Sequence, residues 1–174
     1  MYGKYLAPVS KGDAIMFAGA QGDHLLFTKA TTNTSGFKSE WVVGVAPRDY
    51  AINDFGHVQT FGTISGFDTS VWPEGSILYV DNEVPGRLLD SEPSSPNYSI
   101  EIAAVTRSHQ NEGSIFVRPT FGKWSLEKLK DVRIEHPTVS DPTDSDGMHN
   151  QFLMFDSDIQ LWKNQTINVN YGTY

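Results

Sequence analysis

Glycines and a Pro-Glu-Gly turn divide the stretch from Gly56 to Val80 into short segments, and this division constrains the fold more than any other feature of the chain. The segments His57–Phe61, Thr63–Ile64 and Ile77–Val80 are rich in alternating or β-branched residues. Short runs of this kind, bounded by Gly and Pro, are typical of strands joined by tight turns. We therefore expect a β-meander here, and nothing in the stretch resembles an active site.

Similar runs occur through the first 120 or so residues. Met1–Pro8 is expected to be a short lead-in arm, and Gly86 in a Pro-Gly turn is expected to take the positive φ that a type II turn requires. Further strands are expected over Ala14–Ala18, His24–Ala30, Glu40–Ala46, Ser99–Ser108 and Ser114–Pro119. The count, about eight or nine strands without a convincing helix, predicts an all-β protein, a compact β-barrel or sandwich.

The composition of the chain changes near Phe121-Gly122-Lys123, which predicts a β-domain over 1–122 and a C-terminal segment over 123–174. Trp124–Lys130 is compatible with a short helix that would be unstable alone. Gln151–Phe155 and Ile159–Lys163 are expected to pair as a terminal β-hairpin. This segment has too few apolar side chains to fill a core, so it must pack on the first domain or on other copies of the chain.

The predicted hairpin carries apolar residues on both faces, because Phe152 and Met154 alternate with Leu153 and Phe155 along one strand. One face can pack inward, and the other then needs a partner, either the first domain or a symmetry mate. Such aromatic residues also suit carbohydrate stacking or protein docking. The residues predicted to make contacts between copies or with partners are Leu126, Leu129, Val132, Leu153, Phe155, Leu161 and Trp162.

Bulk properties exclude several classes of function. The formal net charge of -8 argues against a protein that binds the phosphate backbone of a nucleic acid. The absence of cysteine excludes disulfides, thiolate zinc sites and cysteine nucleophiles. No apolar run approaches the roughly 20 residues needed to cross a bilayer, and the first residues lack the pattern of a secretion signal. We expect no insertion into a membrane.

No pattern of catalytic or metal-binding residues stands out. Asp141–Gly147 partly resembles a calcium loop but lacks the closing glutamate and the spacing of an EF-hand, so we interpret it as a solvated loop. The five histidines have no metal spacing, and no G-x-S-x-G motif occurs. Carboxylates near turns that could form a glycosidase pair are Asp13, Asp68, Glu74, Asp81 and Glu83. An acidic protein offers such sets by chance, so we predict a protein without enzymatic activity and without a cofactor.

Two groups of short motifs follow one another along the chain. In the first domain the motifs are Lys11–Asp13, Val43–Ala46, Gly56–Val58, Gly62, Trp72–Val80, Pro85–Leu88, Ile102–Val105 and Gly113–Val117. In the C-terminal segment they are Leu126–Val132, Pro137, Asn150–Asp156 and Leu161–Asn164, in the order L-x-DV, Pro, Q-x-L-x-Y/F-D, W-x-N with the acidic loop inserted. The first group resembles modules of tailed-bacteriophage structural proteins, in particular tail and neck fibres and more loosely head decoration proteins, and the second is similar to a segment of tail fibres.

The resemblance implies a virion protein, assembled in the host cytoplasm, that forms a homotrimer and binds other proteins of the tail, neck or capsid. Its first domain would be the attachment point or the exposed head, and its terminal hairpin would hold the protomers together. Two alternatives remain at this point: a capsid decoration protein, and a tail-spike module that binds or degrades host surface glycans.

Overall fold

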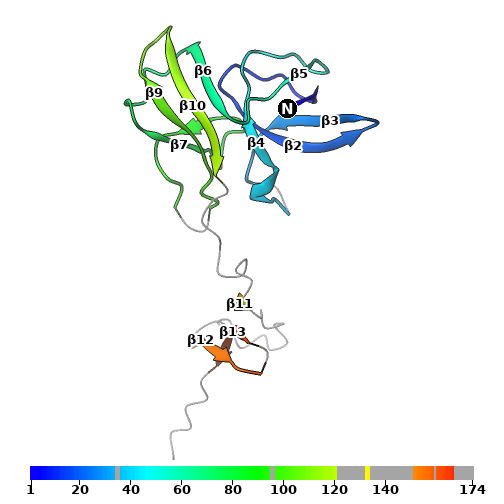
Figure 1. Ribbon diagram of the computed structural model, residues 1–174, viewed down its shortest axis with the longest axis vertical. Helices are drawn as coiled ribbons and strands as arrows, with labels where there is room; N and C mark the ends of the chain where they lie inside the picture. Colours follow the sequence, from blue (N-terminus) through cyan, green and yellow to red (C-terminus); the bar gives the residue numbers. More distant parts are fainter. Residues whose placement is uncertain (34–35, 95–96, 121–131, 134–150, 159, 167–174) are drawn as a thin grey trace, which may run out of the picture. The chain divides into compact units, whose positions relative to one another are not determined.

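The computed structural model describes residues 1–33, 36–94, 97–120, 132–133, 151–158 and 160–166. These residues are mostly β-strand, and the helical element among them is a single 3-10 turn, η1 (Ser39–Trp41). The all-β class predicted from the sequence is therefore confirmed. The chain divides into two compact units, Met1–Lys123 and Trp124–Tyr174, whose described strands are shown in Figure 1.

The first sheet of unit 1 contains five strands in the order β4-β2-β3-β1-β5. Their bounds are β1 (Tyr2–Tyr5), β2 (Ala14–Gln21), β3 (His24–Lys29), β4 (Val42–Val45) and β5 (Phe55–His57). β1 pairs parallel to β3 and antiparallel to β5. The prediction of a lead-in arm over Met1–Pro8 is therefore wrong for Tyr2–Tyr5, which is an inner strand with a fully buried Tyr5.

The second sheet is antiparallel throughout and has the order β6-β10-β9-β7-β8. Its strands are β6 (Gly62–Phe67), β7 (Ile77–Val80), β8 (Leu88–Leu89), β9 (Glu101–Arg107) and β10 (Gly113–Thr120). This sheet curls into a half-barrel, seen as the green and yellow-green strands of Figure 1. Residues 1–120 hold ten strands in their described part, where the sequence suggested eight or nine.

Two hydrophobic clusters form the core of unit 1. The larger one joins the sheets, because Met16 and Val45 of the first sheet pack with Leu78 and Ile115 of the half-barrel. The smaller cluster lies on the other face of the first sheet, around Tyr5, Ile15, Phe27, Val43 and Tyr50. The first sheet is thus covered on both faces near β2 and β4, which explains why all four residues of β4 are buried.

Trp41 and Gly86 lie at the junction between the strands and the core. Trp41 is partly buried against the larger cluster, which holds Val45, whereas Val43 belongs to the smaller one. Gly86 has φ 84°, which confirms the predicted positive φ. Its N–H donates to the Ala30 carbonyl and its carbonyl accepts from the Ala14 N–H, both at 2.8 Å. The turn between β7 and β8 is thereby bonded to β2 and to the end of β3.

Unit 2 contains a small sheet in the order β11-β13-β12. Its strands are β11 (Val132–Arg133), β12 (Gln151–Asp156) and β13 (Leu161–Thr166). β12 runs antiparallel to β13, and β11 runs parallel to it. The predicted helix over Trp124–Lys130 and the Asp141–Gly147 loop lie outside the described residues. Within the described ranges, no helix is both long enough and apolar enough to span a membrane.

Candidate functional site

An exposed aromatic pair lies on one face of the C-terminal sheet. Phe155 of β12 is directly opposite Trp162 of β13, and their ring centroids are 5.4 Å apart. Leu153 lies two residues before Phe155 and therefore points to the same side of the sheet. These three side chains are 37% (Leu153), 48% (Phe155) and 42% (Trp162) exposed. We call them the aromatic face.

The turn that joins β12 to β13 fixes this pairing. The Asp158 N–H donates to Asp156 Oδ1 at 3.0 Å, a local bond typical of Asx turns. Gln160 takes the left-handed conformation, with φ 54°, just before β13 begins. This turn places Asp156 opposite Leu161. The next pair along the hairpin, away from the turn, is Phe155 with Trp162.

The structure brings together only some of the predicted contact residues. Leu153, Phe155 and Trp162 share the aromatic face, and Val132 of β11 is in register with Trp162. Leu161 is half-buried and opposite Asp156, so it belongs to the other face. Leu126 and Leu129 lie outside the described residues.

The opposite face of this sheet is not purely apolar. Met154 there is 41% exposed, and Lys163, its partner across the strands, forms an ion pair with Asp156. Lys and Asp side chains favour contact with water unless they are paired and buried. The aromatic face is therefore the more apolar of the two.

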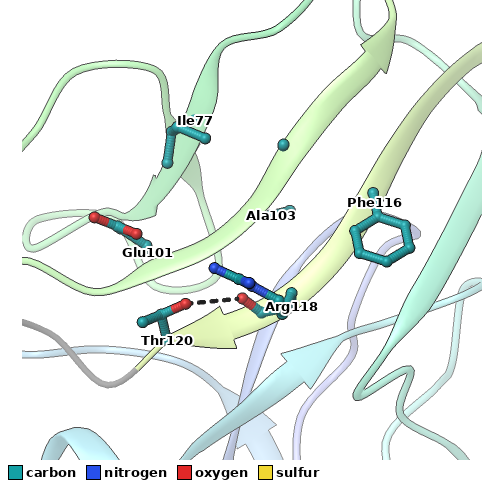
Figure 2. A pocket seen from close by; sticks show the side chains of 7 residues that line it. Ile77, Glu101, Ala103, Phe116, Arg118 and Thr120 are labelled. Carbon is teal, nitrogen blue, oxygen red and sulfur yellow. Dashed lines mark hydrogen bonds between the residues drawn. The ribbon is translucent and has the colours of Figure 1, made fainter.

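A second candidate site is a hollow on the outer face of the half-barrel sheet. The row Ile77, Ala104 and Phe116 crosses β7, β9 and β10, since Ala104 is in register with both of the others. The small Ala104 side chain lies between the two larger ones and leaves a hollow of about 230 Å³. Figure 2 shows Glu101, Arg118 and Thr120 at one end of this hollow.

Irregular strand pairing creates the hollow. On β9, the neighbouring residues Ile102 and Ala103 are both buried, and the less buried Glu101 and Ala104 on either side of them are therefore three residues apart. The pairing registers shift at Leu78/Tyr79 between β7 and β9, and again at Val117/Thr120 between β9 and β10. Such bulges redirect side chains and commonly lie next to functional sites.

The hollow was not predicted from the sequence. Two signals were available: the run Ile102–Ala103 breaks strict alternation, and Pro119 interrupts β10. Proline cannot donate a ladder hydrogen bond, so inside a paired strand it indicates an edge or a bulge. Neither signal gives the depth of the hollow, which depends on the register of three strands.

Four of the five carboxylates considered for glycosidase chemistry, those of Asp13, Asp68, Glu74 and Asp81, bond to neighbouring groups. Asp13 pairs with Lys29 at 2.9 Å, and Asp81 pairs with Arg87. The remaining contacts are the Ser70 N–H to Asp68 at 2.9 Å, the Ser108 N–H to Glu74 at 3.1 Å, and the Glu83 N–H to Asp81 at 2.8 Å. Across the described parts of the chain, no three His, Asp or Glu side chains gather closely enough to hold a metal ion.

No protein-family model matches the chain, and no curated protein matches it. The function is therefore inferred from the surfaces themselves and from the motifs quoted above.

Proposed function

We propose that the chain is a structural protein of a tailed-bacteriophage virion, a tail or neck fibre or adaptor subunit that acts by protein binding and by forming a homotrimer. The aromatic face carries this proposal: Leu153, Phe155 and Trp162 present one apolar surface on a sheet of only three strands. Exposed apolar surface of this kind is typical of sites of protein association.

Burial of the aromatic face supplies the driving force. Fully burying a side chain of the Leu or Phe type contributes about 1.5–3 kcal/mol relative to leaving it exposed. Each copy would contribute Leu153, Phe155 and Trp162, so the gain is repeated for every protomer of a closed ring. The sum must exceed the loss of translational and side-chain freedom on association, which favours a symmetric assembly with several repeats of the contact.

The edge of β12 supports self-association in a second way. Among the described strands, β12 lies at the edge of its sheet and pairs with β13 alone. An open, apolar edge strand is a template for pairing with another chain. In this proposal the hairpin is the oligomerisation segment, and unit 1 binds other virion proteins of the tail, neck or capsid.

The test is the mass of the full chain in solution, measured by light scattering coupled to size-exclusion chromatography. We expect the parent chain to have a trimer mass and the double variant Phe155→Ala/Trp162→Ala to have a monomer mass. Met154→Ala is the matched control, because it removes an equally exposed side chain from the other face. A double variant that keeps the parental mass, or a parent chain that is itself a monomer, contradicts the proposal.

A further inference from the structure

The charged side chains at the hollow of the half-barrel sheet form no ion pair with other described residues. The ion pairs of the described residues are Lys29–Asp13, Arg87–Asp81, Arg107–Glu112 and Lys163–Asp156, and none of them includes Glu101 or Arg118. Arg118 is exposed and Glu101 is half-buried, although both line the same hollow. The site thus places free hydrogen-bond donors and free acceptors side by side.

The floor between these groups is apolar. Ile77, Ala104 and Phe116 line it, and the Phe116 ring is held by an edge-on contact with Phe61 at 5.2 Å between centroids. A ligand that matches this surface needs an apolar face for the floor and a rim of groups that both donate and accept hydrogen bonds. A pyranose ring has this combination, because its C–H bonds form one face and its hydroxyls surround it.

Size and charge restrict the ligand further. A hollow of about 230 Å³ lies below the roughly 300–1,000 Å³ of sites for drug-sized molecules. It therefore fits a single ring rather than a longer compound. The charges of Glu101 and Arg118 cancel locally, and the net charge of -8 over the whole chain repels anionic polymers. A neutral sugar is favoured over an acidic one.

We propose that this hollow binds one neutral hexose unit of a glycan. Arg118 donates to the sugar hydroxyls, Glu101 and the Thr120 hydroxyl accept from them, and the C–H face of the ring packs on Phe116 and Ala104. Glu101, Phe116, Arg118 and Thr120 are thus the binding residues. The site lies wholly in unit 1 and is independent of the self-association proposed for unit 2.

The experiment is saturation-transfer NMR on the full chain with four neutral probes: methyl α-D-glucopyranoside, methyl β-D-galactopyranoside, methyl α-D-mannopyranoside and N-acetyl-D-glucosamine. We expect transfer to the ring C–H protons of at least one probe at millimolar concentration. Absence of transfer to all four probes overturns the proposal. Displacement of a bound sugar by leucine at equal concentration also overturns it, because the Glu–Arg rim would then be a site for a zwitterion.

Variants then locate the bound sugar. Arg118→Ala and Glu101→Gln should each weaken binding about tenfold, since the first removes a charged donor and the second replaces a charged acceptor by a neutral amide. Phe116→Leu keeps the apolar volume but removes the flat ring, and it should also weaken binding. Arg107→Ala is the matched control: it removes an exposed arginine of β9 that pairs with Glu112, away from the hollow. Equal affinity of all these variants overturns the assignment to this hollow, and unchanged mass and thermal midpoint exclude misfolding as the cause of a loss.

Discussion

Gly56 is a position at which the core leaves no room for a side chain. A Cβ added there would overlap the ring of Tyr50. Tyr50 cannot move aside easily, because its ring stacks on Tyr5 with centroids 4.4 Å apart. The Tyr50 hydroxyl also accepts from the His57 N–H at 3.1 Å. The position needs glycine for space, not for backbone conformation.

Gly56→Ala should therefore lower the free energy of unfolding by about 1–3 kcal/mol, the usual range for overpacking a closed site. Urea unfolding followed by tyrosine and tryptophan fluorescence measures this change. Gly22→Asn is the control: nothing lies within 4 Å of a Cβ there, and its φ of 60° is one that asparagine adopts readily. A similar loss in both variants would show that backbone conformation, and not the Tyr50 ring, causes the effect.

Asp81 is a nearly buried carboxylate whose ionised form the fold stabilises. Burial acts to raise its pKa, but hydrogen bonds from the Glu83 N–H and from Arg87 act in the opposite direction and prevail. The pKa of Asp81 is therefore held below its ordinary value of 3.8. A depressed carboxylate pKa contributes stability that is present above the unfolded value and is lost as the pH falls through the folded value.

Asp81→Asn should lower the free energy of unfolding at neutral pH by about 1–3 kcal/mol, because Arg87 and the Glu83 N–H lose a charged acceptor. The difference from the parent should shrink as the pH falls below 3.8 and Asp81 protonates in the parent. Urea unfolding between neutral pH and about pH 2 measures both effects. Asp23→Asn removes an exposed carboxylate as the control for net charge. A difference that stays constant over this pH range would show that Asp81 does not contribute through ionisation.

Among the elements, a fully buried threonine joins the β6–β7 connection to the β9–β10 turn. The Thr69 hydroxyl donates to the Arg107 carbonyl at 2.7 Å and accepts from the His109 N–H at 3.2 Å. The Thr69 N–H also donates to the His109 carbonyl at 3.1 Å. These bonds satisfy backbone groups where β9 ends, beyond the regular pairing with β10.

Thr69→Val keeps the shape of this side chain but leaves the Arg107 carbonyl and the His109 N–H without their partner. We expect a loss of about 1–3 kcal/mol in the free energy of unfolding, and faster hydrogen exchange at the His109 amide. Thr69→Ser keeps the hydroxyl and should show slow exchange at that amide. Equal exchange at the His109 amide in the Val and Ser variants would show that the Thr69 hydroxyl does not protect this amide.

The local sequence pattern was enough to locate most strands along the chain, but it did not show which strands pair with each other. Ile77–Val80 was predicted with the bounds that β7 has, because this short run of β-forming residues follows the Pro-Glu-Gly turn. Tyr2–Tyr5 was missed as a strand. Its partners are β3 and β5, the latter more than fifty residues away, and its Tyr-Gly-Lys-Tyr sequence contains nothing that specifies a distant strand. Pairing is decided by the core as a whole.

The same limit applies to the candidate sites. Alternation placed Leu153 and Phe155 on one side of their strand, as the register shows. It could not show which of the neighbours Leu161 and Trp162 shares that side, because this depends on where the turn ends, and the positive φ of Gln160 sets that point. The hollow at Ala104 was invisible for a related reason, since two register shifts create it.

In the molecule as a whole, the hydrophobic core described belongs to one unit. The two clusters draw all their buried members from the range Tyr5–Val117, within unit 1. A chain of about 120 residues is long enough to bury a stable core. The exposed Leu153, Phe155 and Trp162 belong to unit 2. We therefore expect unit 1 to determine the stability of the fold and unit 2 to determine self-association.

A chain ending at Lys123 should thus unfold with a free energy within about 0.5 kcal/mol of that of unit 1 in the full chain, as expected for independent parts. It should also have a monomer mass at concentrations where the full chain is a trimer. Urea unfolding and light scattering on the two chains measure the two quantities separately. Marked destabilisation of the shorter chain would mean that residues 124–174 complete the core, and a retained trimer mass would place the oligomer contact in unit 1. The second result would contradict the role proposed for Phe155 and Trp162 while leaving the sugar site at Arg118 open to its own test.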